Sequence, residues 1–131
     1  MDKLQNSKQY DLEDRTLNFA KKIIEFVNKL PKTLSNIEIS RQMVKASGSV
    51  GANYIEANES LSKKDFLMRV KICRKEAKET RYWLKLISCD KESEKERTNL
   101  IQESTELMKI FGAIIEKTNS KSQALYTKQK F

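Results

Sequence analysis

The stretch from Phe66 to Ile87 carries apolar or small side chains at alternating steps of four and three residues. This spacing keeps the side chains on one side of a helix over about six turns, which is typical of a helix that packs along its neighbours in a bundle. The sequence therefore predicts one long helix with a buried stripe inside an all-α fold. The stripe consists of Phe66, Val70, Cys73, Ala77, Thr80, Leu84 and Ile87.

The opposite side of the same predicted helix is basic. At about 100° per residue, five lysines gather there together with Tyr82. Nine basic and three acidic residues between Ser62 and Ser88 give this segment a net charge of +6, in a chain whose total is +8. Such a concentrated positive field attracts phosphate groups or an acidic protein, although a lysine-rich surface can also serve only solubility. We call this set the lysine face: Lys64, Lys71, Lys75, Lys78 and Lys85.

Local start and stop signals divide the 131-residue chain into four helices. Asp11 caps a first helix that ends before Pro31, and Ser35 with Glu38 opens a second over residues 36–59. Ser62 with Asp65 opens the third helix, and Ser93 with Glu96 opens a fourth that ends near Asn119. Because the connections are short, we expect an antiparallel up-down-up-down four-helix bundle over residues 11–119. Residues 1–10 and the basic tail 120–131 are expected to be flexible.

The cellular compartment is predicted from what the chain does not contain. Met1 to Asp11 is polar and gives no secretory signal, and no stretch approaches the roughly 18 apolar residues of a membrane span. Two cysteines, Cys73 and Cys89, are too few for a disulfide framework. We therefore expect a cytoplasmic protein with no membrane partner.

The second predicted helix contains an unusual small-residue segment. Two glycines inside a helix cost about 1 kcal/mol each relative to alanine, so they need a reason. A phosphate-binding loop is disfavoured, because the segment lacks Gly-Lys-Ser/Thr and no strand precedes it. We expect instead that the small side chains allow close approach of another helix, either in the same chain or in a neighbouring subunit. The residues are Ser47, Gly48, Gly51 and Ala52.

The chain contains no histidine, which removes the usual general base and the commonest metal ligand. Paired glutamates on neighbouring bundle helices resemble di-iron sites, but those sites also need Glu-x-x-His motifs. We therefore predict no catalytic residue, no metal site and no cofactor. Glu56, Glu76, Glu79 and Trp83 are expected at helix or subunit contacts, where the glutamates pair with arginines of a neighbouring helix. Trp83, next to Tyr82, could stack on a nucleobase, but we favour a core or interface position for so large an aromatic residue.

Several segments resemble the bacterial four helix bundle protein family, also called the 23S rRNA intervening-sequence protein family. The resemblance covers residues 12–118 in helical layout. The segments that carry it are Ser49–Asn53, Glu56–Ala57, Ser62–Phe66, Lys71–Ile72 and Lys75–Leu84.

This resemblance implies an antiparallel four-helix bundle that assembles into a ring-shaped homopentamer. The family takes its name from genes inside insertions in 23S rRNA. It is related to the accessory protein of diversity-generating retroelements, which assists a reverse transcriptase. The resemblance implies no catalytic residues for this chain. Nucleic-acid binding by the family is an inferred role.

Together these observations favour a non-enzymatic, oligomeric module that binds nucleic acid, and structured RNA in particular, through phosphate contacts to the lysine face. Sequence specificity should be low, because nothing resembles a module that recognises particular bases. Two alternatives remain open. One is an adaptor for an acidic protein partner such as a reverse transcriptase, and the other is a purely structural bundle.

Overall fold

The computed structural model describes the backbone of residues 3–130 and the side chains of residues 12–121. Within this range the regular structure is helical, which confirms the predicted all-α class. None of the described helices contains an apolar stretch that could span a membrane. The elements are α1 (Lys3–Asn28), α2 (Leu34–Asn58), α3 (Lys63–Leu86), the short 3₁₀ helix η1 (Lys91–Ser93) and α4 (Glu94–Lys130).

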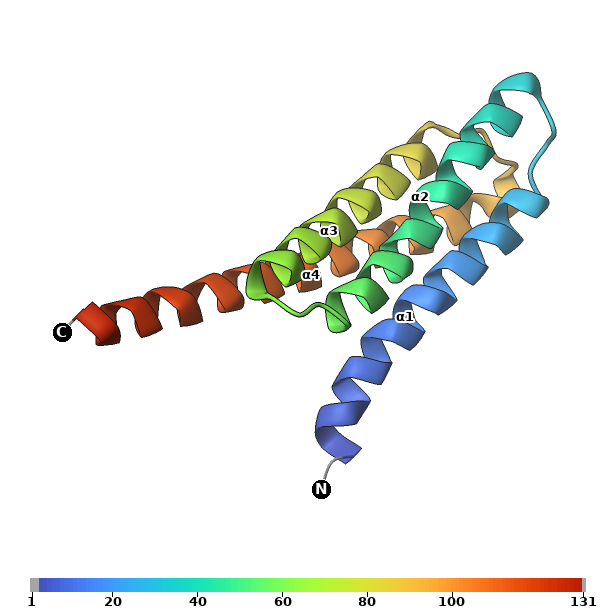
Figure 1. Ribbon diagram of the computed structural model, residues 1–131. Helices are drawn as coiled ribbons and strands as arrows, with labels where there is room; N and C mark the ends of the chain where they lie inside the picture. Colours follow the sequence, from blue (N-terminus) through green and yellow to red (C-terminus); the bar gives the residue numbers. More distant parts are fainter. Residues whose placement is uncertain (1–2, 131) are drawn as a thin grey trace.

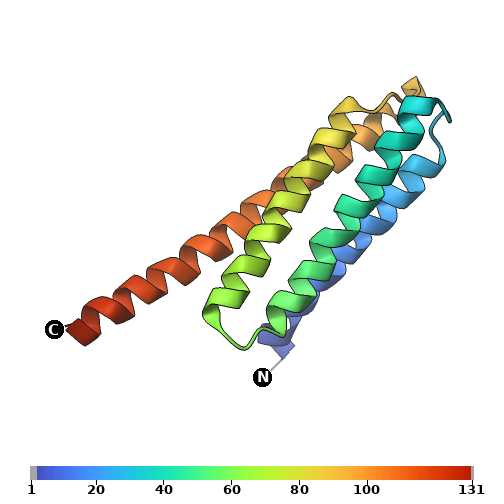
Figure 2. The same ribbon diagram turned by 45° about the horizontal axis from the view of Figure 1, so that its top comes forward.

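The helices form a bundle in which consecutive helices lie side by side, and the chain turns back at each short connection (Figure 1). α3 packs along both α2 and α4 and is the best-contacted helix of the four. α1 packs on α2 and touches α4 much less. The turned view shows the same order of neighbours and shows the C-terminal part of α4 continuing past the beginning of α3 (Figure 2).

The stripe predicted on α3 forms part of the core. Val70, Cys73, Ala77, Thr80 and Leu84 are completely buried, and the other two members of the stripe are buried or half-buried. A side-chain period of 3.5 residues is thus sufficient to identify the buried side of this helix. The largest side chains that pack around the stripe are Phe19, Phe26, Phe111, Ile23, Met43 and Leu107.

Among the described side chains, each of the four long helices also buries one serine or threonine hydroxyl in this apolar interior. Thr16 on α1, Ser47 on α2, Thr80 on α3 and Ser104 on α4 are at most 1% exposed. Each hydroxyl donates a hydrogen bond to a carbonyl three or four residues earlier in its own helix, at 2.8–3.1 Å. Because the bond is local, a small polar side chain can be buried without a partner on another helix.

The predicted helix starts are confirmed in part. Ser62 caps α3 and accepts a hydrogen bond from the Asp65 amide at 3.1 Å, as expected. The capping box predicted at Ser35 is wrong, because Thr33 caps α2 and accepts from the Asn36 amide at 3.2 Å. Threonine is also a capping residue, and it is the first one after Pro31, so the helix begins two residues earlier.

The outer ends of the first and last helices differ more from the prediction. α1 begins at Lys3 rather than at Asp11, and α4 continues to Lys130 rather than ending near Asn119. Neither segment contains a proline or a terminal glycine, and their polar residues are mostly adequate helix formers, so nothing local stops the helix. Met1, Asp2 and Phe131 lie outside the described residues, and the flexibility expected at both ends stays a prediction.

Asn36 joins two loops that are far apart in the sequence. Its side-chain amide donates to the carbonyl oxygens of Pro31 and Ser88, at 3.0 and 2.9 Å, and its Oδ1 accepts from the Ser88 amide at 3.2 Å. Asn36 is only 2% exposed, so its polar atoms would be costly to leave unpaired. This residue therefore ties the α1–α2 connection to the end of α3.

The two thiols should differ in reactivity. Burial raises the pKa of Cys73 to about 12 and also raises the pKa of the half-buried Cys89. Only the thiolate is a good nucleophile, and Cys73 has no solvent access. We expect a thiol reagent to label Cys89 in the native protein and Cys73 only on global unfolding. Peptide mass spectrometry over a labelling time course checks this, and equal labelling rates for the two residues would contradict the buried position of Cys73.

Candidate nucleic-acid interface

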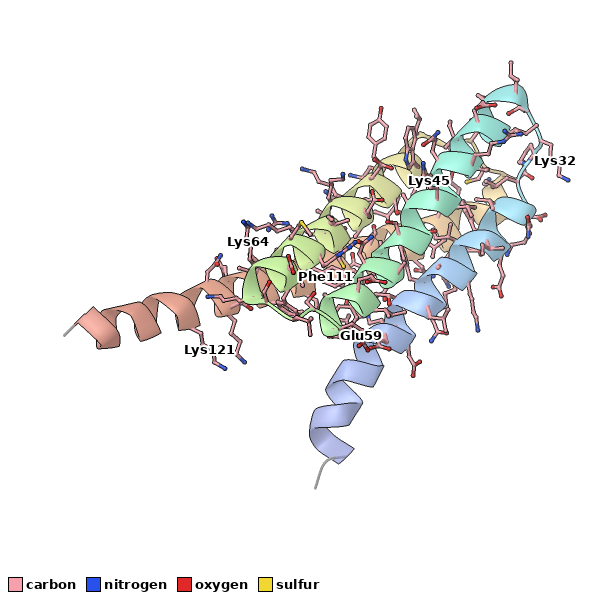
Figure 3. All side chains as sticks on the ribbon, in the orientation of Figure 1. Lys32, Lys45, Glu59, Lys64, Phe111 and Lys121 are labelled. Atoms are coloured by element: carbon pink, nitrogen blue, oxygen red, sulfur yellow. The ribbon has the colours of Figure 1, made fainter. Side chains whose placement is uncertain are left out.

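The lysine face lies on the outer side of α3. All five of its lysines are exposed, and the segment from Lys64 to Lys85 extends for about 30 Å at 1.5 Å per residue. Figure 3 shows Lys64 pointing away from the bundle at the start of α3, whereas Phe111 lies among the helices. Arg74 is exposed near the same face and adds to its charge, although the sequence analysis did not include it in the lysine face.

These lysines are not neutralised by neighbouring carboxylates. In the part of the chain with described side chains, the ion pairs are Arg15–Glu103, Arg15–Glu106, Lys29–Glu96 and Arg97–Glu94. All four use residues of α1, of the turn that follows it or of α4, and none uses a residue of α3. The positive charge of the lysine face is therefore available to an external anion.

The side of α3 next to the lysine face packs against α2. Arg69 donates a hydrogen bond to the Asn53 side chain of α2 at 3.0 Å. Glu76 and Glu79 are half-buried on this side, but neither forms an ion pair within residues 12–121. The predicted pairing of these glutamates with arginines of a neighbouring helix is thus not formed within one chain, and pairing across a subunit contact stays a prediction. The arginines of α3 itself bond elsewhere, since Arg81 donates to Thr105 of α4 at 3.2 Å.

Two aromatic residues meet at the border between this flank and the lysine face. Trp83 is half-buried and packs against the core, which agrees with the expected core or interface position. Its indole Nε1 is buried and has no hydrogen-bond partner among the described residues. Tyr82 is 58% exposed and meets the Trp83 ring edge-to-face, with the centroids 5.1 Å apart and the planes at 75°.

The residues of the small-residue segment face two different sides of α2. A Cβ atom on Gly51 would lie 2.9 Å from Thr16 Oγ1 and 3.2 Å from Thr16 Cβ, so α1 approaches α2 closely at this point. The predicted close approach is therefore confirmed for Gly51, and Ser47, about one helical turn before it, is buried. For Gly48 and Ala52 it is wrong within one chain, because both are exposed and a Cβ on Gly48 would meet nothing within 4 Å. These two residues lie on the outer side of the helix, and their contact with a second subunit stays a prediction.

Three hollows in the described surface are lined mostly by charged and polar residues. Two of about 410 and 560 Å³ lie between α1 and α4, and both include Lys22 and Glu103. Arg15 donates to both oxygens of Glu103, at 2.7 and 2.8 Å, and this bonding raises the pKa of the guanidinium. A third hollow includes the exposed Glu56 and the half-buried Arg69 at the α2–α3 connection. The ion pairs of Arg15 in α1 with Glu103 and Glu106 in α4 were not predicted, because nothing in the sequence indicates which charges of two distant helices face each other.

The sequence of this chain matches the model of a known protein family. A family model described as 23S rRNA-intervening sequence protein matches residues 8–113. The chain belongs to this family. The resemblance inferred from the motifs of α2 and α3 is therefore confirmed, over nearly the same part of the chain.

A solved member of the S23 ribosomal protein family has a similar structure. It is a protein with unknown function from Bacteroides thetaiotaomicron, and its sequence is 31% identical to this chain. The similarity has a TM-score of 0.69 and covers 79% of this chain and 97% of the Bacteroides protein. Comparison with curated proteins finds no match.

Proposed function

We propose that this protein is a non-enzymatic, oligomeric module of the bacterial cytoplasm that binds structured RNA through the lysine face of α3. The observation that carries the proposal is the row of five exposed lysines, none of which is engaged in an ion pair with another described residue. Membership of a family named for 23S rRNA insertions is consistent with an RNA ligand.

Phosphate contacts would supply most of the affinity. Each lysine that neutralises a phosphate releases condensed counterions, so binding weakens as salt concentration rises. Lysine is a point charge on a flexible stem and does not fix the geometry of a particular base. The lysine face should therefore bind RNA and DNA of different sequences with similar affinity.

We further propose that the up-down-up-down bundle assembles into a homopentameric ring. An exposed apolar surface supports this assembly, because α1 and α2 present large aliphatic side chains on their shared outer side. Thr16 against Gly51, and a hydrogen bond of 2.9 Å from Asn58 to Glu13, show which sides of the two helices face each other. Gly48, with its open surroundings, lies on the same outer surface. We call this set the aliphatic face: Leu17 and Ile24 of α1, and Ile37 and Ile55 of α2, which are 39–51% exposed.

A charge placed in the aliphatic face should separate the subunits. We expect the wild-type protein to be a stable oligomer at micromolar concentration, and Ile24→Glu to lower its mass toward that of a monomer, because an unpaired buried carboxylate is costly. Leu61→Glu is the matched control, since Leu61 is fully exposed in the α2–α3 connection. Light scattering measures all three proteins. A monomeric wild type, or an Ile24→Glu protein of unchanged mass, would contradict the proposed interface.

The binding proposal is tested with three probes at several salt concentrations: a folded RNA hairpin, a DNA duplex and an acidic peptide. We expect both nucleic acids to bind, with affinities that fall steeply with salt, and the peptide to bind weakly. Tight and selective binding of the peptide would favour the adaptor role, with an acidic partner such as a reverse transcriptase. If none of the probes binds, the protein is a structural bundle with a solvated lysine face.

A further inference from the structure

The lysine face surrounds one exposed aromatic residue. At about 100° per residue, Tyr82 lies on the same side of α3 as the five lysines. Lys78 precedes it by about 6 Å along the helix axis, and Lys85 follows it by about 4.5 Å. An aromatic ring between cationic side chains is the arrangement that sequence-tolerant single-strand binding proteins use, with bases stacked on rings and the backbone held by positive charge.

The Tyr82 ring is held in position by its neighbour. Trp83 meets it edge-to-face at a centroid distance of 5.1 Å, and Trp83 is itself fixed by packing on the core. A ring with restricted rotamers loses little conformational entropy when a base stacks on it. The edge-to-face contact uses one part of the Tyr82 ring, and 58% of the residue stays exposed to solvent.

The charges around Tyr82 are asymmetric. Lys78 and Lys85 lie toward α4, the helix that Arg81 contacts through Thr105. Glu79 lies on the α2 side of the ring, the side on which Arg69 bonds to Asn53. The half-exposed Leu86 is one turn further along α3 and adds apolar surface beside the ring. A nucleic-acid backbone would therefore follow the α4 side, with a base turned toward Tyr82.

We propose that Tyr82 is a stacking platform for an unpaired base, so that the ligand is a single strand or a loop rather than a continuous duplex. The bases of a duplex are stacked on each other and do not offer a free face to a side chain. The proposal rests on the proposed function, because stacking adds to phosphate binding by the lysine face. It goes further by naming the class of nucleic acid and one contact residue.

The test uses oligouridine RNA, oligothymidine DNA and a blunt DNA duplex of equal length, with the full-length protein. Tyr82→Ala and Tyr82→Leu should weaken binding of both single strands about 5- to 100-fold, since stacking on one base accounts for such a range, and should leave duplex binding unchanged. Tyr82→Phe should bind like the wild type because it keeps the ring. The salt slope should not change in any Tyr82 variant, because no cation is removed.

The outcomes separate this proposal from the proposed function. If Tyr82→Ala binds single strands like the wild type while lysine-face variants are weakened, the lysine face is functional and the stacking proposal is wrong. Equal losses on single strands and duplex would also overturn it, since Tyr82 would then act through folding or subunit assembly. If the wild type binds no probe at all, the proposed function fails and stacking fails with it. A 5-iodouracil probe provides a direct readout, with a photo-crosslink expected at Tyr82 and its absence counting against contact.

Discussion

Gly51→Leu is expected to lower the free energy of unfolding by about 1–3 kcal/mol, or to prevent formation of the native bundle. Even the first side-chain carbon would stand 2.9 Å from Thr16 Oγ1 and 3.2 Å from Thr16 Cβ. The Thr16 hydroxyl cannot move away cheaply, because it donates to the carbonyl oxygens of Leu12 and Glu13, both at 2.9 Å. α1 and α2 would therefore have to separate. Thermal or denaturant unfolding followed by circular dichroism measures the change.

Alanine substitution at two helical glycines provides the control. Gly112→Ala should stabilise the bundle by up to about 1 kcal/mol, because a Cβ there meets nothing within 4 Å and alanine is the better helix former. Gly51→Ala should have the opposite sign. A raised melting temperature for Gly51→Ala would contradict the close approach of α1 and α2.

The second large effect is expected on binding. Replacing Lys71, Lys75 and Lys78 with glutamine should weaken nucleic-acid binding about 100-fold at 0.1 M salt. The loss of each lysine–phosphate contact lowers the affinity roughly fivefold at this salt concentration. The loss should be similar for different sequences, because phosphate contacts do not identify bases. The melting temperature should change little, as all three side chains are exposed.

A second triple variant shows whether position or total charge decides binding. Lys21, Lys95 and Lys117 are exposed residues of α1 and α4, and their replacement with glutamine removes the same charge from other helices. We expect this variant to retain most of the affinity in filter-binding or fluorescence-anisotropy titrations. Similar losses in both triple variants would mean that only net charge matters and that the lysine face is not a site.

Local periodicity predicted the buried side of α3 because helix geometry alone places residues 3.5 apart on one side. The two glycines inside the second helix predicted a close helix approach in the small-residue segment. The sequence could not tell that Gly51 faces α1 while Gly48 faces outward, since that depends on the angle at which α1 packs. The helix ends were less predictable, because capping residues compete locally, as Thr33 and Ser35 do.

Contacts between distant segments could not be predicted. Asn36 bonds to Ser88 across 52 positions, and Arg15 bonds to Glu103 across 88. Each depends on a side chain that meets its partner only after the helices have packed. The lysine face needed no such contact, because its members lie within one helix. Its exposure could therefore be predicted from α3 alone, whereas the choice between a core and an interface position for Trp83 needed the packed bundle.

The salt dependence of binding tests the central claim most directly. A plot of log affinity against log salt concentration for a single-stranded RNA should be linear, with a slope of about −0.7 for each phosphate neutralised. Replacing Lys71, Lys75 and Lys78 with glutamine should reduce that slope by about 2 units, while the Lys21, Lys95 and Lys117 variant keeps the wild-type slope. An equal slope in the wild type and the lysine-face variant would contradict nucleic-acid binding by the outer face of α3.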